Sequence, residues 1–290
     1  ALERGDVKLT DSIDLERGQF RFFDRVMKDS EKHDYRMMTV KDIFAISSNV
    51  GISRLIQEQY GKQPQLFLQG LENLGLGKLT QIEIKGEGKP LIKKPGSKGW
   101  SGVTLPWMSV GYELRVTPLQ MLALYNAVAN EGKMMRPYLV KEVQEYGKAV
   151  KKYQPEVLQA SIASASTIRQ ARELLEHVAV MGTAKHLQGK QYQIAGKTGT
   201  ALIADNSAGY RGSVKYRATF AGYFPADKPR YSVIVVVNNP SAGVYYGGYV
   251  AGPVFKEMAD KVYASHINPS LNQERPTDER PDYLILKGGR

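Results

Sequence analysis

The spacing of apolar residues predicts two consecutive helices early in the chain. Thr39 followed by Asp42 is typical of a helix start, and apolar positions then recur at helical spacing as far as the polar segment 47–49. A second helix is expected over residues 50–60, with no linker before it. Ser47 and Asn49 therefore lie at an elbow, where a short polar side chain often caps the next helix.

The same pattern predicts further helices and a group of strands in the rest of the chain. Thr117 and Pro118 mark one helix start, because threonine caps well and proline suits the first helical position. The Val/Ile run at 231–237 predicts a strand buried on both faces. Helices are expected at 65–78, 119–130, 164–181 and 250–264, a strand pair within 136–157, and strands at 191–202, 216–224 and 231–237, with loops at 80–99 and after 202.

Lys197 lies in a strand that is rich in glycine and threonine. Such a composition favours an edge strand whose backbone approaches a ligand. Thr198 and Thr200 supply hydroxyls, and the missing Cβ at Gly199 would admit an extended peptide or a carboxylate-bearing acyl compound. On local grounds alone, a Gly-rich turn with a solvated lysine remains the alternative. A phosphate-binding P-loop is excluded, since Gln191 stands where its first glycine is needed.

Composition narrows the classes of partner and chemistry. The net charge of +11 over 290 residues suits an anionic partner, but the lysines are scattered without aromatic residues between them, so we expect solvated loops and no nucleic acid. The absence of cysteine excludes disulfides, thiolate zinc sites and cysteine nucleophiles. The four histidines show no metal-ligand spacing, so neither a metal nor a cofactor is expected.

The elbow and the Lys197 strand, about 150 residues apart, resemble two of the three signatures of the penicillin-binding and serine β-lactamase superfamily. The matching motifs are Ser47-Ser48-Asn49 and Lys197-Thr198-Gly199-Thr200. Further segments also resemble this superfamily, including Val116-Thr117-Pro118-Leu119-Gln120 and Ala218-Thr219-Phe220-Ala221-Gly222-Tyr223-Phe224-Pro225. Residues 1–265 resemble the transpeptidase domain of a class B penicillin-binding protein, nearest the division-type members, and 266–290 are expected to be a polar linker or tail.

The resemblance implies an α/β (α+β) fold, with an antiparallel sheet flanked by helices and an all-helical subdomain. It also implies a peptidoglycan DD-transpeptidase that cross-links stem peptides by serine acyl transfer and is trapped by β-lactam antibiotics. Further implied partners are proteins of a division or elongation complex. The implied location is the outer face of the cell membrane, reached through an N-terminal anchor outside this chain.

The resemblance also assigns roles to individual residues. Ser47 would relay a proton to the leaving amine, Asn49 would hold the substrate amide, and Lys197 would polarise Ser47. Gly199 would admit the substrate, while Thr198 and Thr200 would bind its carboxylate, the Thr200 amide also serving the oxyanion. We expect Ser47, Asn49, Lys197 and Thr198 to converge in one groove, with Lys197 Nζ near Ser47 Oγ. Tyr245-Tyr246-Gly247-Gly248 is interpreted as a turn rather than a site.

The family's first signature, Ser-x-x-Lys, is missing: no serine in this sequence has lysine three positions on. Truncation before that motif is the simplest expectation. It would remove the nucleophile and the first strands of the sheet, leaving a chain that is inactive alone and exposes unpaired strand edges. Two alternatives stay open, namely a DD-carboxypeptidase or β-lactamase of the same fold, and a non-catalytic scaffold.

Overall fold

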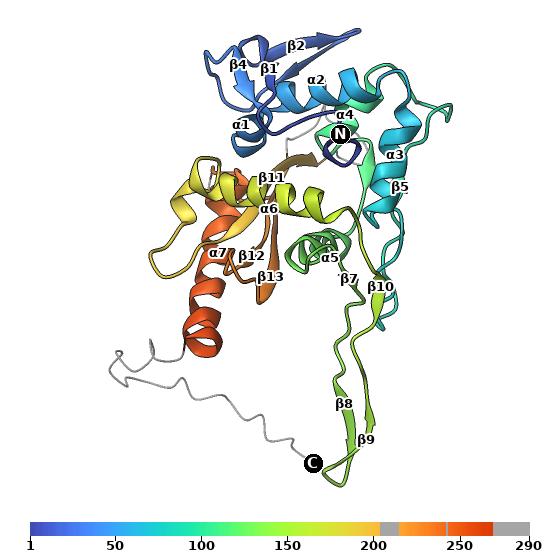
Figure 1. Ribbon diagram of the computed structural model, residues 1–290, viewed down its shortest axis with the longest axis vertical. Coiled ribbons are helices and arrows are strands. Elements are labelled where there is room, and N and C mark those ends of the chain that lie inside the picture. The colour runs from blue at the N-terminus through green and yellow to red at the C-terminus, as the bar shows by residue number, and fades with distance from the viewer. Residues whose placement is uncertain (204–214, 242, 269–290) are drawn as a thin grey trace. The chain divides into compact units, whose positions relative to one another are not determined.

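The computed structural model describes residues 1–203, 215–241 and 243–268 (Figure 1). The expected loop after residue 203 lies outside these residues, as does the expected tail from residue 269 on. Two compact units are distinguished, Ala1–Phe255 and Lys256–Arg290. The described part of the second unit is helical, and ion pairs one turn apart, between Lys256 and Asp260 and between Glu257 and Lys261, support its helix.

The expected helices are present, and the described residues hold one more α-helix. Thr39 caps the first by accepting a hydrogen bond from the Asp42 amide, and Thr117 forms a reciprocal capping box with Gln120. The short helix α4 was not expected from the sequence, and α3 ends at Asn73, five residues earlier than expected. The helices are α1 (Val40–Ala45), α2 (Asn49–Tyr60), α3 (Pro64–Asn73), α4 (Thr104–Ser109), α5 (Pro118–Ala129), α6 (Ala165–Val180) and α7 (Gly247–Val262).

A three-stranded antiparallel sheet carries the Lys197 motif. Its strands are β11 (Ala195–Ile203), β12 (Lys215–Phe224) and β13 (Tyr231–Asn238), in that order, with Lys197 opposite Ala221. The other strands form two-stranded antiparallel pairs: β1 (Ser12–Asp14) with β4 (Met37–Thr39), β2 (Gln19–Phe22) with β3 (Arg25–Lys28), β5 (Leu91–Ile92) with β6 (Leu114–Arg115), β7 (Met134–Met135) with β10 (Val157–Gln159), and β8 (Glu142–Glu145) with β9 (Lys148–Lys152).

The prediction that 231–237 is buried on both faces is wrong. Every residue of this run within β13 is partly or fully exposed to solvent, and among the described residues β13 pairs only with β12. The central, most buried strand is β12, whose sequence mixes alanine, glycine and threonine with aromatic residues. A Val/Ile run indicates a strand, but only the pairing order decides which strand lies in the middle of the sheet.

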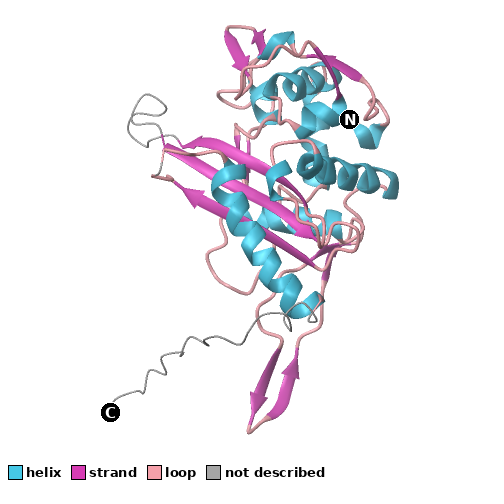
Figure 2. Cartoon of the chain, turned by 90° about the vertical axis from the view of Figure 1, so that its left-hand side faces the viewer, coloured by secondary structure: helices cyan, strands magenta, loops and turns pink. Residues whose placement is uncertain are grey.

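Helices pack on both faces of the sheet (Figures 1 and 2). Ala195 and Tyr223 join a core cluster with residues of α5 and α6, including Ala127 and Leu175. On the opposite face, Phe255 of α7 packs edge-on against Phe220, with ring centroids 4.7 Å apart. Because neighbouring residues of a strand point to opposite faces, Lys197 and Thr198 face different layers. No helix among the described residues is long and apolar enough to cross a membrane.

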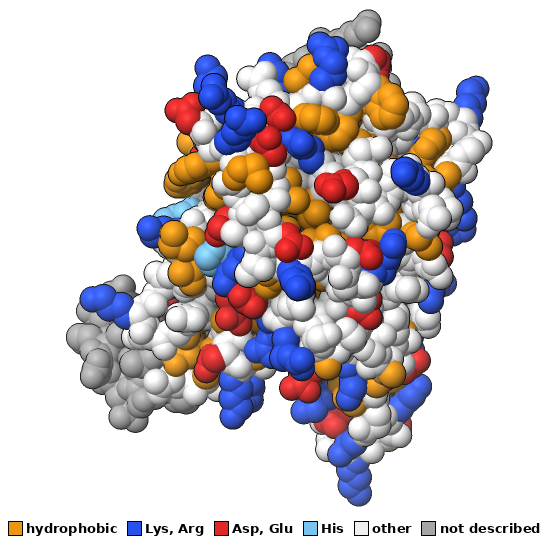
Figure 3. Space-filling view, turned by 45° about the horizontal axis from the view of Figure 1, so that its top comes forward, with side chains coloured by type: hydrophobic (Ala, Val, Ile, Leu, Met, Phe, Trp, Pro, Cys, Tyr) orange, Lys and Arg blue, Asp and Glu red, His pale blue; other side chains and the backbone are white. Residues whose placement is uncertain are grey.

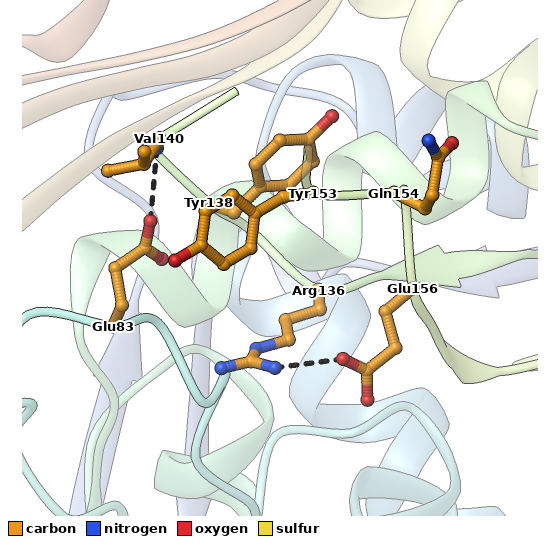
Figure 4. Close-up of a pocket in the computed structure, with 7 residues that line it drawn as sticks. All are labelled: Glu83, Arg136, Tyr138, Val140, Tyr153, Gln154 and Glu156. Atoms are coloured by element: carbon orange, nitrogen blue, oxygen red, sulfur yellow. Dashed lines mark hydrogen bonds and ion pairs between the residues drawn. The ribbon is translucent and has the colours of Figure 1, made fainter. Parts of the chain in front are cut away.

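The β8–β9 hairpin extends away from the body of its unit, and its strands are almost wholly exposed (Figure 2). A cavity of about 100 Å³ lies at its base, lined by Glu83, Arg136, Tyr138, Val140, Tyr153, Gln154 and Glu156 (Figure 4). The Glu83 carboxylate accepts hydrogen bonds from the backbone of Leu139 and Val140, and Arg136 pairs with Glu156 at 2.8 Å. These bonds anchor the hairpin, and none of the expected site residues lines the cavity.

Candidate active site

The elbow between α1 and α2 holds Ser47 in an unusual backbone conformation. Its φ of 60° lies in the left-handed region, which few residues other than glycine adopt. The next residue, Ser48, caps α2 by accepting a hydrogen bond from the Gly51 amide at 2.9 Å. Strained backbone of this kind persists only where the surroundings hold it, and it is common at functional sites.

Asp29 fixes the elbow from a loop that the sequence pattern did not single out. Its carboxylate, only 5% exposed, accepts hydrogen bonds from the Ser48 hydroxyl and the Val50 amide, both at 2.9 Å, and lies 2.8 Å from His33 Nε2. An acidic group at a helix N-terminus also gains from the helix dipole. An aspartate in a polar segment that also holds Glu31 and Asp34 gives no signal of this role in the sequence.

Lys197 contacts Ser47 directly across the gap between β11 and the elbow. Its Nζ donates a hydrogen bond to Ser47 Oγ at 2.7 Å and a second to the Thr198 carbonyl at 3.2 Å. No carboxylate among the described residues forms an ion pair with it. Burial lowers the pKa of the Lys197 amine to about 8, because the charged form loses hydration. The amine can therefore gain and lose a proton close to neutral pH.

Thr198 and Thr200 point to the face of β11 opposite Lys197, and the hydroxyls of both make hydrogen bonds. Thr198 Oγ1 lies 2.7 Å from Thr183 Oγ1, and Thr200 Oγ1 accepts a hydrogen bond from the Gly247 amide at 3.0 Å. Between them, Gly199 has room for a side chain to begin. A Cβ built there meets nothing closer than Thr219 Cβ at 3.6 Å.

Tyr245-Tyr246-Gly247-Gly248 borders this strand, which its interpretation as a turn did not anticipate. A Cβ on Gly247 would lie 2.4 Å from the Gly199 carbonyl, so only glycine allows α7 to begin so close to β11. The Tyr245 ring stacks on Tyr216 with centroids 3.9 Å apart. The signal in the sequence was the glycine pair itself, since paired glycines also mark close backbone approach.

The structure confirms the expected contact between Ser47 and Lys197. Thr198 follows on the same strand but faces the opposite layer, so the convergence of all four residues in one groove stays a prediction. Asn49 starts α2, and its side-chain amide donates a hydrogen bond to the Lys28 carbonyl at 2.9 Å. No cluster of potential metal ligands occurs among the described residues. On the face in Figure 3, cationic and anionic side chains are interspersed.

Comparisons with known proteins agree with this arrangement. Residues 1–260 match the family model of the penicillin-binding protein transpeptidase domain. The chain is 33% identical over 290 residues to peptidoglycan D,D-transpeptidase FtsI of Escherichia coli K12, covering 99% of the chain and 45% of that protein. It is 32% identical over 252 residues to penicillin-binding protein PbpB of Mycolicibacterium smegmatis, covering 84% of the chain and 38% of that protein.

A solved structure extends the likeness to three dimensions. Penicillin-binding protein 3 of Mycobacterium tuberculosis, crystallised with aztreonam, superposes with a TM-score of 0.78 at 28% identity, covering 92% of this chain and 60% of the other. The chain thus spans less than half the length of the two curated relatives. Because the family model matches most of the chain, the chain belongs to the penicillin-binding protein transpeptidase family. Its relatives are class B members of that family.

Proposed function

We propose that the protein containing this chain is a peptidoglycan DD-transpeptidase that cross-links stem peptides during cell division. The observation that carries the proposal is the 2.7 Å hydrogen bond from Lys197 Nζ to Ser47 Oγ, which joins two family motifs 150 residues apart. The names of the relatives support the reaction, and the aztreonam complex of the structural neighbour supports binding of β-lactams.

In the proposed reaction, a serine hydroxyl attacks the D-Ala-D-Ala carbonyl and forms an ester as the peptide bond breaks. The leaving amine of D-alanine takes a proton through Ser47, which Lys197 holds and polarises. The amine of a neighbouring stem peptide then attacks the ester and restores the serine. Asn49 would hold the substrate amide once its bond to the Lys28 carbonyl is exchanged for the ligand.

Thr198, Gly199 and Thr200 form the substrate side of the proposed site. The hydroxyls of Thr198 and Thr200 would bind the terminal carboxylate, and the Thr200 amide would donate to the oxyanion. Gly199 would let the peptide backbone approach the strand, which agrees with the ordinary contact, at 3.6 Å from Thr219 Cβ, that an added Cβ would make there.

The nucleophile is not assigned to a residue of this chain, because the sequence contains no Ser-x-x-Lys. Residues 1–290 alone should accordingly form no covalent adduct with penicillin. Residues 1–265 would be the penicillin-binding domain and 266–290 a polar linker or tail. In the whole protein, the domain would work on the outer face of the cell membrane, held by an anchor elsewhere in the protein and in contact with division or elongation proteins.

Mass spectrometry after incubation with benzylpenicillin tests the proposal, using the full-length product of the gene and residues 1–290 in parallel. We expect a stable adduct on the full-length protein and none on residues 1–290. Cross-linked dimers should form when the full-length protein is given stem-peptide substrate. Rapid turnover of penicillin would instead indicate a hydrolase, and the absence of both adduct and turnover would indicate a scaffold.

A further inference from the structure

The segment Gly182-Thr183, directly after α6, contacts three parts of the candidate site. The Thr183 amide donates a hydrogen bond to the Ala45 carbonyl at 3.2 Å, two residues before Ser47. Thr183 Oγ1 lies 2.7 Å from Thr198 Oγ1. Its carbonyl lies against Gly248, where an added Cβ would approach it to 2.7 Å.

From these contacts we infer that Thr183 is a positioning residue, whose hydroxyl orients that of Thr198 toward the carboxylate of the substrate. The inference rests on the proposed function, in which Thr198 binds that carboxylate. It adds a residue outside the recognised motifs, on a loop 15 residues upstream of Thr198.

The hydrogen bond between the Thr183 and Thr198 hydroxyls can run in only one direction when Thr198 binds a carboxylate. A hydroxyl has one proton to donate, and a carboxylate only accepts. Thr198 can donate to a carboxylate only if its proton is not already given to Thr183. When a carboxylate binds, the pair must therefore run from Thr183 to Thr198 to the ligand. A hydroxyl that accepts one hydrogen bond also becomes a stronger donor in the next.

The backbone of the same segment serves a separate purpose. At Gly182, an added Cβ would lie 2.1 Å from the Ala45 carbonyl, so glycine lets the loop close onto the end of α1. The Thr183 amide then bonds that carbonyl without help from its side chain. Because the backbone makes the structural contact and the side chain is only partly buried, the hydroxyl is free to act on Thr198.

Variants of the full-length gene product can separate the role of the Thr183 hydroxyl from that of the fold. Thr183→Val removes the hydroxyl at nearly constant shape, and Thr183→Ser keeps it. Thr80→Val is a matched control, because Thr80 is buried and its hydroxyl has no partner in the described structure. Acylation rates are measured with benzylpenicillin and with its neutral methyl ester, and thermal unfolding is followed for each variant. Thr183→Ala replaces the valine variant if that protein does not fold.

We expect Thr183→Val to lower the acylation rate with benzylpenicillin about tenfold, the upper end of the scale for one hydrogen bond between neutral groups. The rate with the methyl ester should change less than twofold, and Thr183→Ser and Thr80→Val should keep the wild-type ratio of the two rates. An unchanged ratio in Thr183→Val, whether both rates fall or neither does, overturns the inference. A wild-type protein that penicillin does not acylate overturns the proposed function, and the inference with it.

Discussion

The first half of β11 is buried and its second half is open, and a glycine lies in each half. A Cβ on Gly196 would lie 2.6 Å from the Ala221 carbonyl and 2.9 Å from the Phe220 ring. A Cβ on Gly199 would make only an ordinary contact with Thr219. The chain itself therefore requires glycine at 196 and does not require it at 199.

The contrast separates residues that the fold needs from residues that the proposed ligand needs. Lys197 lies between the two glycines, on the same face of the strand as Ala195, and its amine contacts Ser47. In the second half of the strand, Gly199 is partly exposed and Thr200 is exposed. Substitution of Gly196 should therefore act mainly on stability, and substitution of Gly199 mainly on acylation.

The largest effect is expected for Lys197→Met in the full-length protein. Loss of a group that holds and polarises a proton relay typically costs 10²- to 10⁴-fold, so the acylation rate with benzylpenicillin should fall by about that factor. Stopped-flow competition with a fluorescent penicillin measures the rate. A loss below about tenfold would mean that Lys197 does not serve the reaction.

The second effect concerns stability and pH. Between about pH 8 and 10.5, the unfolded chain keeps a proton on Lys197 that the folded chain releases, so the free energy of unfolding should rise with pH. At one pKa unit per 1.36 kcal/mol, we expect wild type to gain about 1–3 kcal/mol relative to Lys197→Met between pH 7 and 10. Urea titrations of residues 1–290 at both pH values measure this difference. Parallel pH profiles for the two proteins would show that burial does not perturb the amine.

The third effect is a difference in stability between alanine substitutions at Gly196 and at Gly199. Gly196→Ala should lower the free energy of unfolding by about 1–3 kcal/mol through overpacking. Gly199→Ala should change it by less than about 1 kcal/mol, since alanine also restricts the unfolded chain. Acylation of the full-length protein should show the reverse order, with the larger loss in Gly199→Ala. Equal effects of both variants on stability would contradict the comparison.

The smallest effect is expected at Thr200. Thr200→Val removes the acceptor of the Gly247 amide at an exposed position, so the free energy of unfolding should fall by about 0.5–1.5 kcal/mol. Thr200→Ser keeps the acceptor and is the matched control. Thermal unfolding of both variants measures the difference, and a valine variant as stable as the serine variant would show that the bond contributes nothing.

Much of this arrangement could be predicted from the sequence, because local signals specify it. Thr39 and Thr117 indicate helix starts because they can cap them. The Ser47 and Lys197 motifs indicate the elbow and the strand. The contact between Ser47 and Lys197 was predicted through the family resemblance, and the distance of 2.7 Å confirms it. The bounds of most helices follow from apolar spacing, which the core itself imposes.

Other features depend on contacts between distant segments and leave no local trace. In the sequence, Asp29 is one polar residue among many, and only the fold brings its carboxylate to the start of α2. Thr183 sits after a helix end, and only the packing of α6 against α1 carries it to Thr198. The burial of residues 231–237 was misjudged for the same reason, since β13 has the most apolar sequence and yet lies beside the central strand.

The β8–β9 hairpin has a practical consequence for experiments on this protein. Its tip residue, Tyr146, is 98% exposed and is followed by Gly147, an arrangement that suits cleavage by proteases and tolerance of inserted sequence. The bonds of Glu83 and Arg136 at the base would keep the two strands attached to the body after a cut. A fluorophore or affinity tag placed at the tip would therefore report on the protein without touching the strand that carries Lys197.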